Sequence, residues 1–140
     1  MDLSSAFLEL RNRNGTVPNP LRLPSETEVD NVEKALGVRF HRDFRRYLLE
    51  VSDVVFGMFE PVTITQPGAH TDLLEVVKAA WEGYGVPRDR VPICEDNADF
   101  YCMNEGGQVV FWSHNGWSSE TWPSLADWIE RVWIAESVSK

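Results

Sequence analysis

The chain has 140 residues, of which 43% are hydrophobic and 25% charged, and its formal net charge is −9. A chain of this length buries roughly two-thirds of its unfolded surface, enough for one domain with its own core. The acidic balance disfavours direct binding to nucleic acid, and no apolar run approaches the ~20 residues of a membrane span. The first residues lack a secretory signal, so we expect a cytoplasmic protein.

The first 24 residues predict a helix followed by a proline-rich connector. A stripe of apolar residues at helical spacing runs through residues 1–12 and consists of Leu3, Ala6, Phe7 and Leu10. Residues 16–24 contain three prolines, which cannot join a regular element. This connector is too short to separate domains, so we expect a single domain over residues 1–140 with its core in residues 25–136.

Two amphipathic helices are predicted after the connector. Ser25 and Glu28 have the spacing of a capping box, and Gly37 is a typical stop. The second helix runs from about residue 41 to 51, with an apolar stripe formed by Phe44, Tyr47, Leu48 and Val51. A basic cluster flanks this stripe and consists of Arg39, Arg42, Arg45 and Arg46. It either binds a phosphate or carboxylate or pairs with the surplus acids, and we favour internal pairing.

The middle of the chain predicts two strands and a further helix. Residues 54–59, which are interrupted by Gly57, and residues 62–65, which follow Pro61, are rich in β-branched and aromatic side chains. Asp72 and Glu75 have capping-box spacing, and the apolar stripe behind them predicts a helix through about residue 82.

Residues 91–113 predict the sheet around which the helices are organised. Apolar runs at 91–94, 100–103 and 109–112 are separated by the polar turn 97–99 and by a turn at Gly106-Gly107, as in an antiparallel meander. A last helix is expected after Ser124, which caps it together with Asp127. The order of elements therefore predicts an α+β fold, a single domain with a mostly antiparallel sheet packed against four to five helices.

No residue pattern indicates a catalytic centre, a metal site or a cofactor. Serines lack a G-x-S-x-G elbow, and the glycine pair precedes a strand rather than a helix. We expect Cys94 and Cys102 to be buried free thiols; a disulfide, a metal site with His114, or a small enzyme that uses His114 with a cysteine is the alternative. The acidic run 95–99 could hold a hard cation, but its Asp and Asn residues favour a plain β-turn.

The last third of the chain combines negative charge with exposed tryptophan. Residues 93–140 contain eight acids and two bases, a balance of −6. Trp117 stands among small polar residues, a composition typical of protein-binding hot spots; the alternatives are that Trp117 folds back onto the sheet and that the acids only solvate the surface. The candidate protein-binding residues are Glu95, Asp96, Asp99, Glu105, Trp117 and Glu120.

The chain resembles the SUKH superfamily, which contains a fungal cell-wall-synthesis regulator and many bacterial toxin-immunity proteins. The likeness covers about residues 20–134. At its opening, a helix ends in Leu36-Gly37 and a second helix carries Phe44 and Tyr47-Leu48. Residues 96–101 and 107–111 match the strand-turn-strand in the middle of the family pattern, and residues 125–129 match its last helix. His41 stands where the family often has proline, and 96–99 replaces its Gly-Gly-Asp turn. The resemblance implies an α+β domain without catalytic residues and an immunity or interaction role.

These observations lead to one hypothesis and one alternative from a different class. We expect a non-enzymatic binding protein that neutralises a bacterial toxin, a nuclease, by direct association. The acidic surface would complement the basic active site of a nuclease and speed the encounter. The alternative is a regulatory or scaffold module without a toxin partner.

Overall fold

The computed structural model describes residues 1–116 and 118–138, and the described residues form five helical segments and one four-stranded sheet. The expected α+β single-domain fold is therefore confirmed. In chain order the elements are α1 (Leu3–Asn12), α2 (Glu26–Leu36), α3 (Arg42–Glu50), α4 (Leu73–Lys78) continued by the π-helix η1 (Ala79–Tyr84), β1 (Val91–Asp96), β2 (Asp99–Met103), β3 (Val109–Trp112), β4 (Thr121–Trp122), and α5 (Leu125–Trp128) continued by the π-helix η2 (Ile129–Ile134) and α6 (Ala135–Val138).

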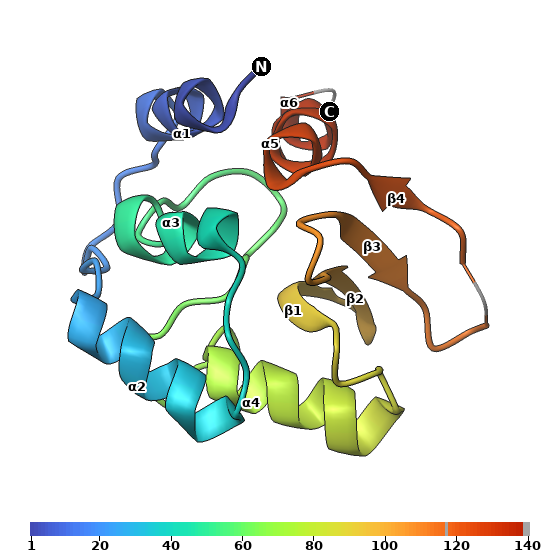
Figure 1. Ribbon diagram of the computed structural model, residues 1–140. Helices are drawn as coiled ribbons and strands as arrows, with labels where there is room; N and C mark the ends of the chain where they lie inside the picture. Colours follow the sequence, from blue (N-terminus) through green and yellow to red (C-terminus); the bar gives the residue numbers. More distant parts are fainter. Residues whose placement is uncertain (117, 139–140) are drawn as a thin grey trace.

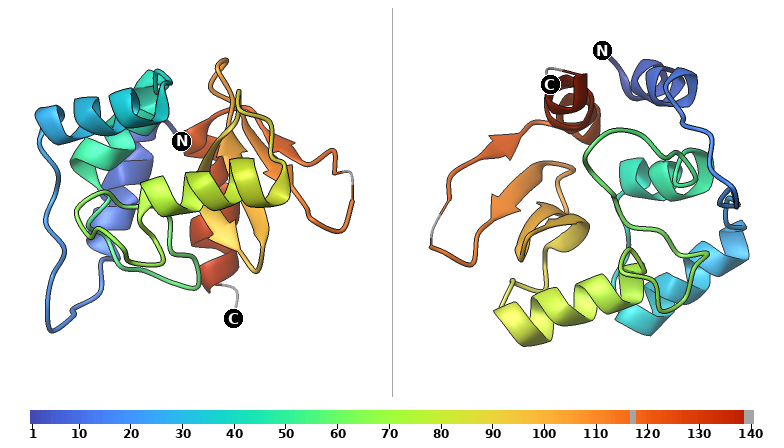
Figure 2. Two further views of the ribbon diagram at one scale, coloured as in Figure 1. Left: turned by 90° about the horizontal axis from the view of Figure 1, so that it is seen from below. Right: turned by 180° about the vertical axis from the view of Figure 1, so that it is seen from behind.

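The helices and the sheet lie side by side around a common core. Helices α1, α2 and α3 form one group, the sheet lies opposite them, and α4 runs along the lower edge against β1 (Figure 1). Two further views show the same division and place the C-terminal helix between α1 and the sheet (Figure 2). The core includes the aromatic side chains of Phe44, Phe100, Trp128 and Trp133, all at most 1% exposed. In the described chain, no helix is long and apolar enough to cross a membrane.

The three N-terminal helices begin and end where local chemistry dictates. Ser25 and Glu28 form the expected capping box, because each side chain accepts the backbone N–H of the other residue. Gly37 ends α2 with a left-handed φ of 71°, which glycine adopts without strain. His41 caps α3, since its Nδ1 accepts the N–H of Asp43 at 3.1 Å. The histidine at this position therefore has a defined local role.

The two strands predicted within residues 54–65 are wrong. Residues 61–65 contribute only two isolated bridges, at Pro61 and Thr63. Pro61 has no N–H, and the hydroxyl of buried Tyr47 donates to the carbonyl of Val62 at 2.9 Å. Gly57 takes a left-handed φ of 71°, which interrupts an extended strand. The neighbouring carbonyl of Phe56 accepts from the Trp133 indole at 2.9 Å. Side chains and backbone groups from several other segments thus satisfy the backbone groups that a ladder would have used, as when the N–H groups of Val62 and Thr63 donate to the carbonyls of Ile93 and Thr71.

The helix predicted from residue 72 is present, but its predicted cap is not. Asp72 makes no capping hydrogen bond; its buried carboxylate instead accepts the N–H of Gly68 at 3.0 Å, which fixes the preceding turn. The helix changes to π-helical hydrogen bonding at Ala79 and ends at Gly85, whose φ is 80°. This ending places Tyr84 beside the sheet.

The sheet is an antiparallel meander in the order β1-β2-β3-β4, as expected for its first three strands. The β1–β2 turn places Asn97 and Ala98 at positive φ (52° and 71°), the geometry of a two-residue hairpin loop. In the β2–β3 turn only Gly107 has a positive φ, 87°. The short strand β4 was not predicted, because two residues are too few to show a period.

Candidate functional site

The β1–β2 turn gathers three carboxylates at one end of the sheet. Asp96 and Asp99 are directly opposite each other in the strand register. Glu95 reaches into the same turn, where its carboxylate accepts the N–H of Ala98 at 2.7 Å. The tight hairpin therefore concentrates negative charge in a space of a few residues. This geometry agrees with the predicted acidic β-turn.

The same turn is tied to the loop that follows β3. Asp99 Oδ1 accepts the backbone N–H of His114 at 3.0 Å and lies 2.7 Å from Nδ1 of its ring. The His114 side chain is 38% exposed and that of Asp99 is 21% exposed. This double contact fixes the loop against the carboxylates and leaves the imidazole accessible.

Aromatic rings extend the acidic turn into a mixed surface. The Tyr84 ring is 44% exposed and lies 6.1 Å from the Trp112 ring and 6.4 Å from the His114 ring. Buried Phe100 supports both Tyr84 and Trp112 from below, at 5.6 Å and 6.0 Å. We call this surface the hairpin face; it consists of Tyr84, Glu95, Asp96, Asp99, Trp112 and His114.

The crowding of acids changes the electrostatics of Asp96. Partial burial raises the pKa of Asp96 above its usual range, and the negative charges of Asp99 and Glu95 raise this pKa further. A cation brought to the hairpin face would relieve this repulsion. The hairpin face is therefore suited to a positively charged ligand or partner.

The other predicted contact residues lie elsewhere. Glu105 sits in the β2–β3 turn, at the opposite end of β2 from Asp99, and does not belong to the hairpin face. Glu120 is exposed and precedes the edge strand β4, where its carbonyl accepts the N–H of Phe111. Trp117 falls outside the described residues. The structure thus brings together three of the six predicted residues.

Three residues of the hairpin face escaped the sequence-based prediction as binding residues. Tyr84 lies on the last turn of η1, and Trp112 and His114 lie at the end of β3 and just beyond it. Packing of η1 beside the sheet brings Tyr84 to the acidic turn, whereas strand pairing and the contact with Asp99 place Trp112 and His114 there. The one usable signal was the strand register, which predicts that the end of β3 lies beside the start of β2.

The predicted basic cluster is largely paired within the protein. Arg45 contacts Asp30 at 2.8 Å and Glu33 at 3.0 Å, both on α2. Arg46 contacts Glu50 at 2.8 Å, one turn along α3. The prediction of internal pairing is confirmed for these two arginines, but Arg39 has no ion pair among the described residues.

The two thiols are free and fully buried, as predicted. Burial raises the pKa of Cys102 to about 12 and that of Cys94 further still. A thiol with so high a pKa does not supply the thiolate that a nucleophile or a metal ligand needs. His114 contacts Asp99 and Tyr84 instead, and no group of three metal-ligating side chains occurs in residues 1–116 and 118–138.

The chain is similar to a protein family in sequence and to a solved structure in sequence and fold. The family model SUKH_5, described as SMI1-KNR4 cell-wall, matches residues 4–134. The chain therefore belongs to the SUKH family. A crystal structure of a protein from Pseudomonas syringae pv. tomato is 43% identical, with a TM-score of 0.87 over 92% of this chain and 96% of that one. A comparison with curated proteins gave no significant match.

Proposed function

We propose that this chain is a non-enzymatic protein-binding domain that neutralises a basic toxin domain, a nuclease, by direct association. The observation that carries the proposal is the hairpin face, where the three carboxylates of one tight turn are joined to partly exposed aromatic rings, since His114 contacts both Asp99 and the Tyr84 ring. Nuclease active sites are positively charged because they hold phosphate. Capping such a site with carboxylates would exclude the nucleic acid and speed the encounter.

The composition of the hairpin face supports a protein as the partner. Tyr84 and Trp112 offer rigid rings that lose little conformational entropy on binding, and such rings dominate the energy of most interfaces. Their shared support, Phe100, is 1% exposed, so the rings rest on a fixed base. Membership in the SUKH family is consistent with an interaction or immunity role.

A non-catalytic role fits the state of the reactive side chains. The Cys94 and Cys102 thiols are 0% exposed, and burial raises the pKa of each. His114 is engaged by Asp99 rather than by a thiol. These side chains therefore lack the pairing of nucleophile and base that covalent catalysis needs.

The test takes the protein encoded next to the gene for this chain as the candidate toxin domain. We expect the two purified proteins to associate and co-expression to restore growth of cells that make the toxin. Asp96→Ala should weaken binding about tenfold, and Tyr84→Ala by more, because an aromatic ring that becomes buried against the partner contributes more than a single charge. Raising the salt concentration should weaken the wild-type complex.

Glu105→Ala is the matched control, since it removes an exposed carboxylate from the other end of β2. Its Kd should match that of the wild type. If Glu105→Ala weakens the complex as much as Asp96→Ala does, the contact surface is not the hairpin face. If the toxin domain neither binds nor loses its toxicity, the proposed function is wrong.

A further inference from the structure

Most of the described basic side chains of this acidic protein form ion pairs, but some do not. Arginines on α1, α3, the connector and the C-terminal helix form ion pairs with carboxylates. Within residues 1–116 and 118–138, the basic side chains without an ion pair are Lys34, Arg39, Lys78, Arg88 and Arg90. Among the described residues, Arg39 and Arg88 therefore have no carboxylate partner that an incoming anion would have to displace.

Two of these arginines line the same cavity. It has a volume of about 520 Å³ and lies between the α2–α3 connection, the segment before β1 and the β2–β3 turn. Arg39 comes from the first of these segments and Arg88 from the second. The volume falls within the range of small-molecule sites, roughly 300–1,000 Å³.

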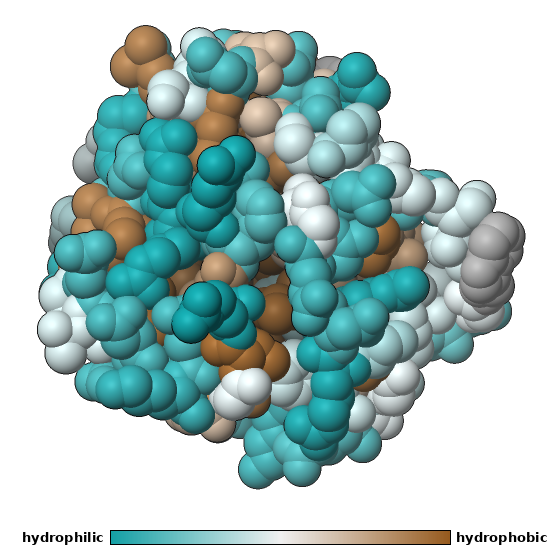
Figure 3. Space-filling view, viewed as in Figure 1, coloured by the Kyte–Doolittle hydropathy of each residue, from teal (hydrophilic) through white to brown (hydrophobic). Residues whose placement is uncertain are grey.

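The lining of the cavity combines apolar and charged groups. Phe44, Val91 and Met103 are buried and belong to its apolar part. Figure 3, viewed as in Figure 1, shows hydrophobic side chains between hydrophilic ones near the middle of this side of the molecule. The acids Asp89 and Glu105 also line the cavity. The two arginines and the two acids leave the lining without net charge, so an anion would gain from direct contact with a guanidinium rather than from the overall charge, and a multiply charged anion would not be favoured.

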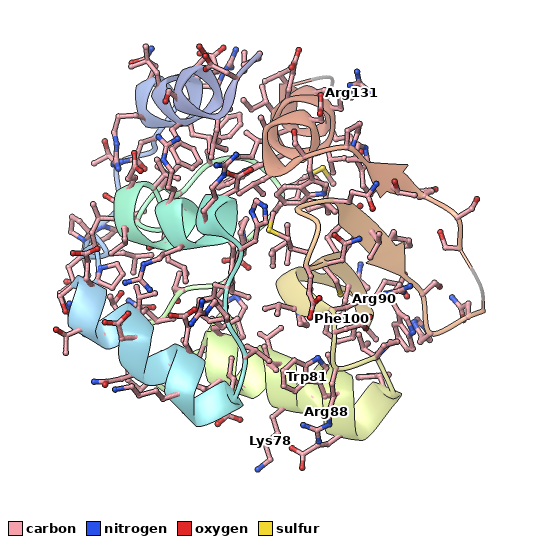
Figure 4. All side chains as sticks on the ribbon, in the orientation of Figure 1. Lys78, Trp81, Arg88, Arg90, Phe100 and Arg131 are labelled. Atoms are coloured by element: carbon pink, nitrogen blue, oxygen red, sulfur yellow. The ribbon has the colours of Figure 1, made fainter. Side chains whose placement is uncertain are left out.

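The walls of the cavity are held in place. Arg88 lies over the Trp81 ring at 5.3 Å, and the Trp81 indole donates to the carbonyl of Arg90 at 2.8 Å. Figure 4 shows Arg88 and Trp81 together beside the helix that carries Lys78. On the other side, His41 packs directly on Gly107 of the β2–β3 turn. A guanidinium fixed in this way loses less entropy when it binds an anion.

We propose that this cavity binds a single carboxylate carried on an apolar body. Guanidinium groups match the planar fork of a carboxylate, and the apolar lining accepts the hydrocarbon part of such a ligand. The source of the carboxylate is either a free small acid or the C-terminal residue of a peptide. This site is separate from the hairpin face and does not rest on the proposed function.

The test is a titration followed by ¹H–¹⁵N NMR with 4-phenylbutyrate as the probe and 4-phenylbutanol as its neutral counterpart. A ligand of about twelve heavy atoms is expected to bind with a Kd on the order of 1 mM. The butyrate should shift the amides of residues 38–41, 88–91 and 103–105, and the alcohol should bind at least tenfold more weakly. A tripeptide ending in phenylalanine, with a free or an amidated C-terminus, distinguishes the two sources.

Arg39→Gln should weaken 4-phenylbutyrate binding about tenfold without changing the melting temperature, because Arg39 is exposed and carries no ion pair among the described residues. Arg42→Gln is the matched control, since this side chain is 90% exposed and does not line the cavity. The proposal is overturned if the alcohol binds as tightly as the acid, if both substitutions have the same effect, or if no cavity amide shifts.

Discussion

Replacement of Gly107 by alanine tests the close contact between the β2–β3 turn and His41, the N-cap of α3. Gly107 has a φ of 87°, a conformation that side chains other than glycine rarely adopt. A Cβ at this position would lie 2.6 Å from Nε2 and 2.9 Å from Cε1 of the His41 ring. That ring is held from its other side, because Nδ1 accepts the N–H of Asp43. Alanine would therefore strain both the backbone and the packing.

Gly107→Ala would carry a backbone cost and a packing cost. A left-handed conformation costs an L-residue about 1–2 kcal/mol. Overpacking of a fitted contact costs about 1–3 kcal/mol. Since both apply to Gly107→Ala, we expect its free energy of unfolding to fall by about 2–5 kcal/mol. Its neighbour Gly106 has no positive φ and an added Cβ there would meet only Asn104 Oδ1, at 3.6 Å, so Gly106→Ala should change stability by less than about 0.5 kcal/mol.

A double-mutant cycle with His41→Ala separates the two costs. His41→Ala removes the ring together with its cap on α3, and the cycle subtracts the effect of losing the cap. In the His41→Ala background, Gly107→Ala should cost only the backbone part. The coupling energy between the two sites should therefore be about 1–3 kcal/mol, measured by urea unfolding of all four proteins.

If Gly107→Ala and Gly106→Ala cost the same, the turn does not require a left-handed residue at position 107. If Gly107→Ala is destabilising but its cost is unchanged by His41→Ala, only the backbone strain contributes to this cost and the contact with His41 does not.

Two further predictions concern an indole pair and an acid-dependent contact. Trp133→Phe should cost about 1–3 kcal/mol more than Trp128→Phe in urea unfolding, because it leaves the carbonyl of Phe56 unpaired, whereas Trp128 Nε1 has no hydrogen-bond partner among the described residues; equal costs would contradict this. The Arg22 guanidinium lowers the pKa of Glu28 to about 2, so the stability that Glu28 contributes is present above its unfolded pKa and is lost as the pH falls from about 4.5 through about 2. Glu28→Gln should therefore reduce the pH dependence of the melting temperature over this window. If the variant shows the same pH dependence as the wild type, the contact between Arg22 and Glu28 does not contribute to stability.

The carboxylates of the candidate site could be predicted, but their neighbours could not. Glu95, Asp96 and Asp99 lie within one hairpin turn, so residue spacing alone places them together. Tyr84 joins them only because η1 packs beside the sheet, and the separation of Glu105 follows from its place at the far end of β2. The cavity is less predictable still, since Arg39 and Arg88 are far apart in the chain.

The sequence by itself determined the features that depend on residues within about one helical turn or one hairpin. The capping box at Ser25, the stop at Gly37 and the first three strands all follow from such local spacing. Only the tertiary structure decided the conformation of residues 54–65. These residues have the composition of strands, but their backbone groups bond to partners from several other segments, among them the side chains of Tyr47 and Trp133 and the carbonyls of Ile93 and Thr71. Which of these partners is within reach depends on the tertiary structure.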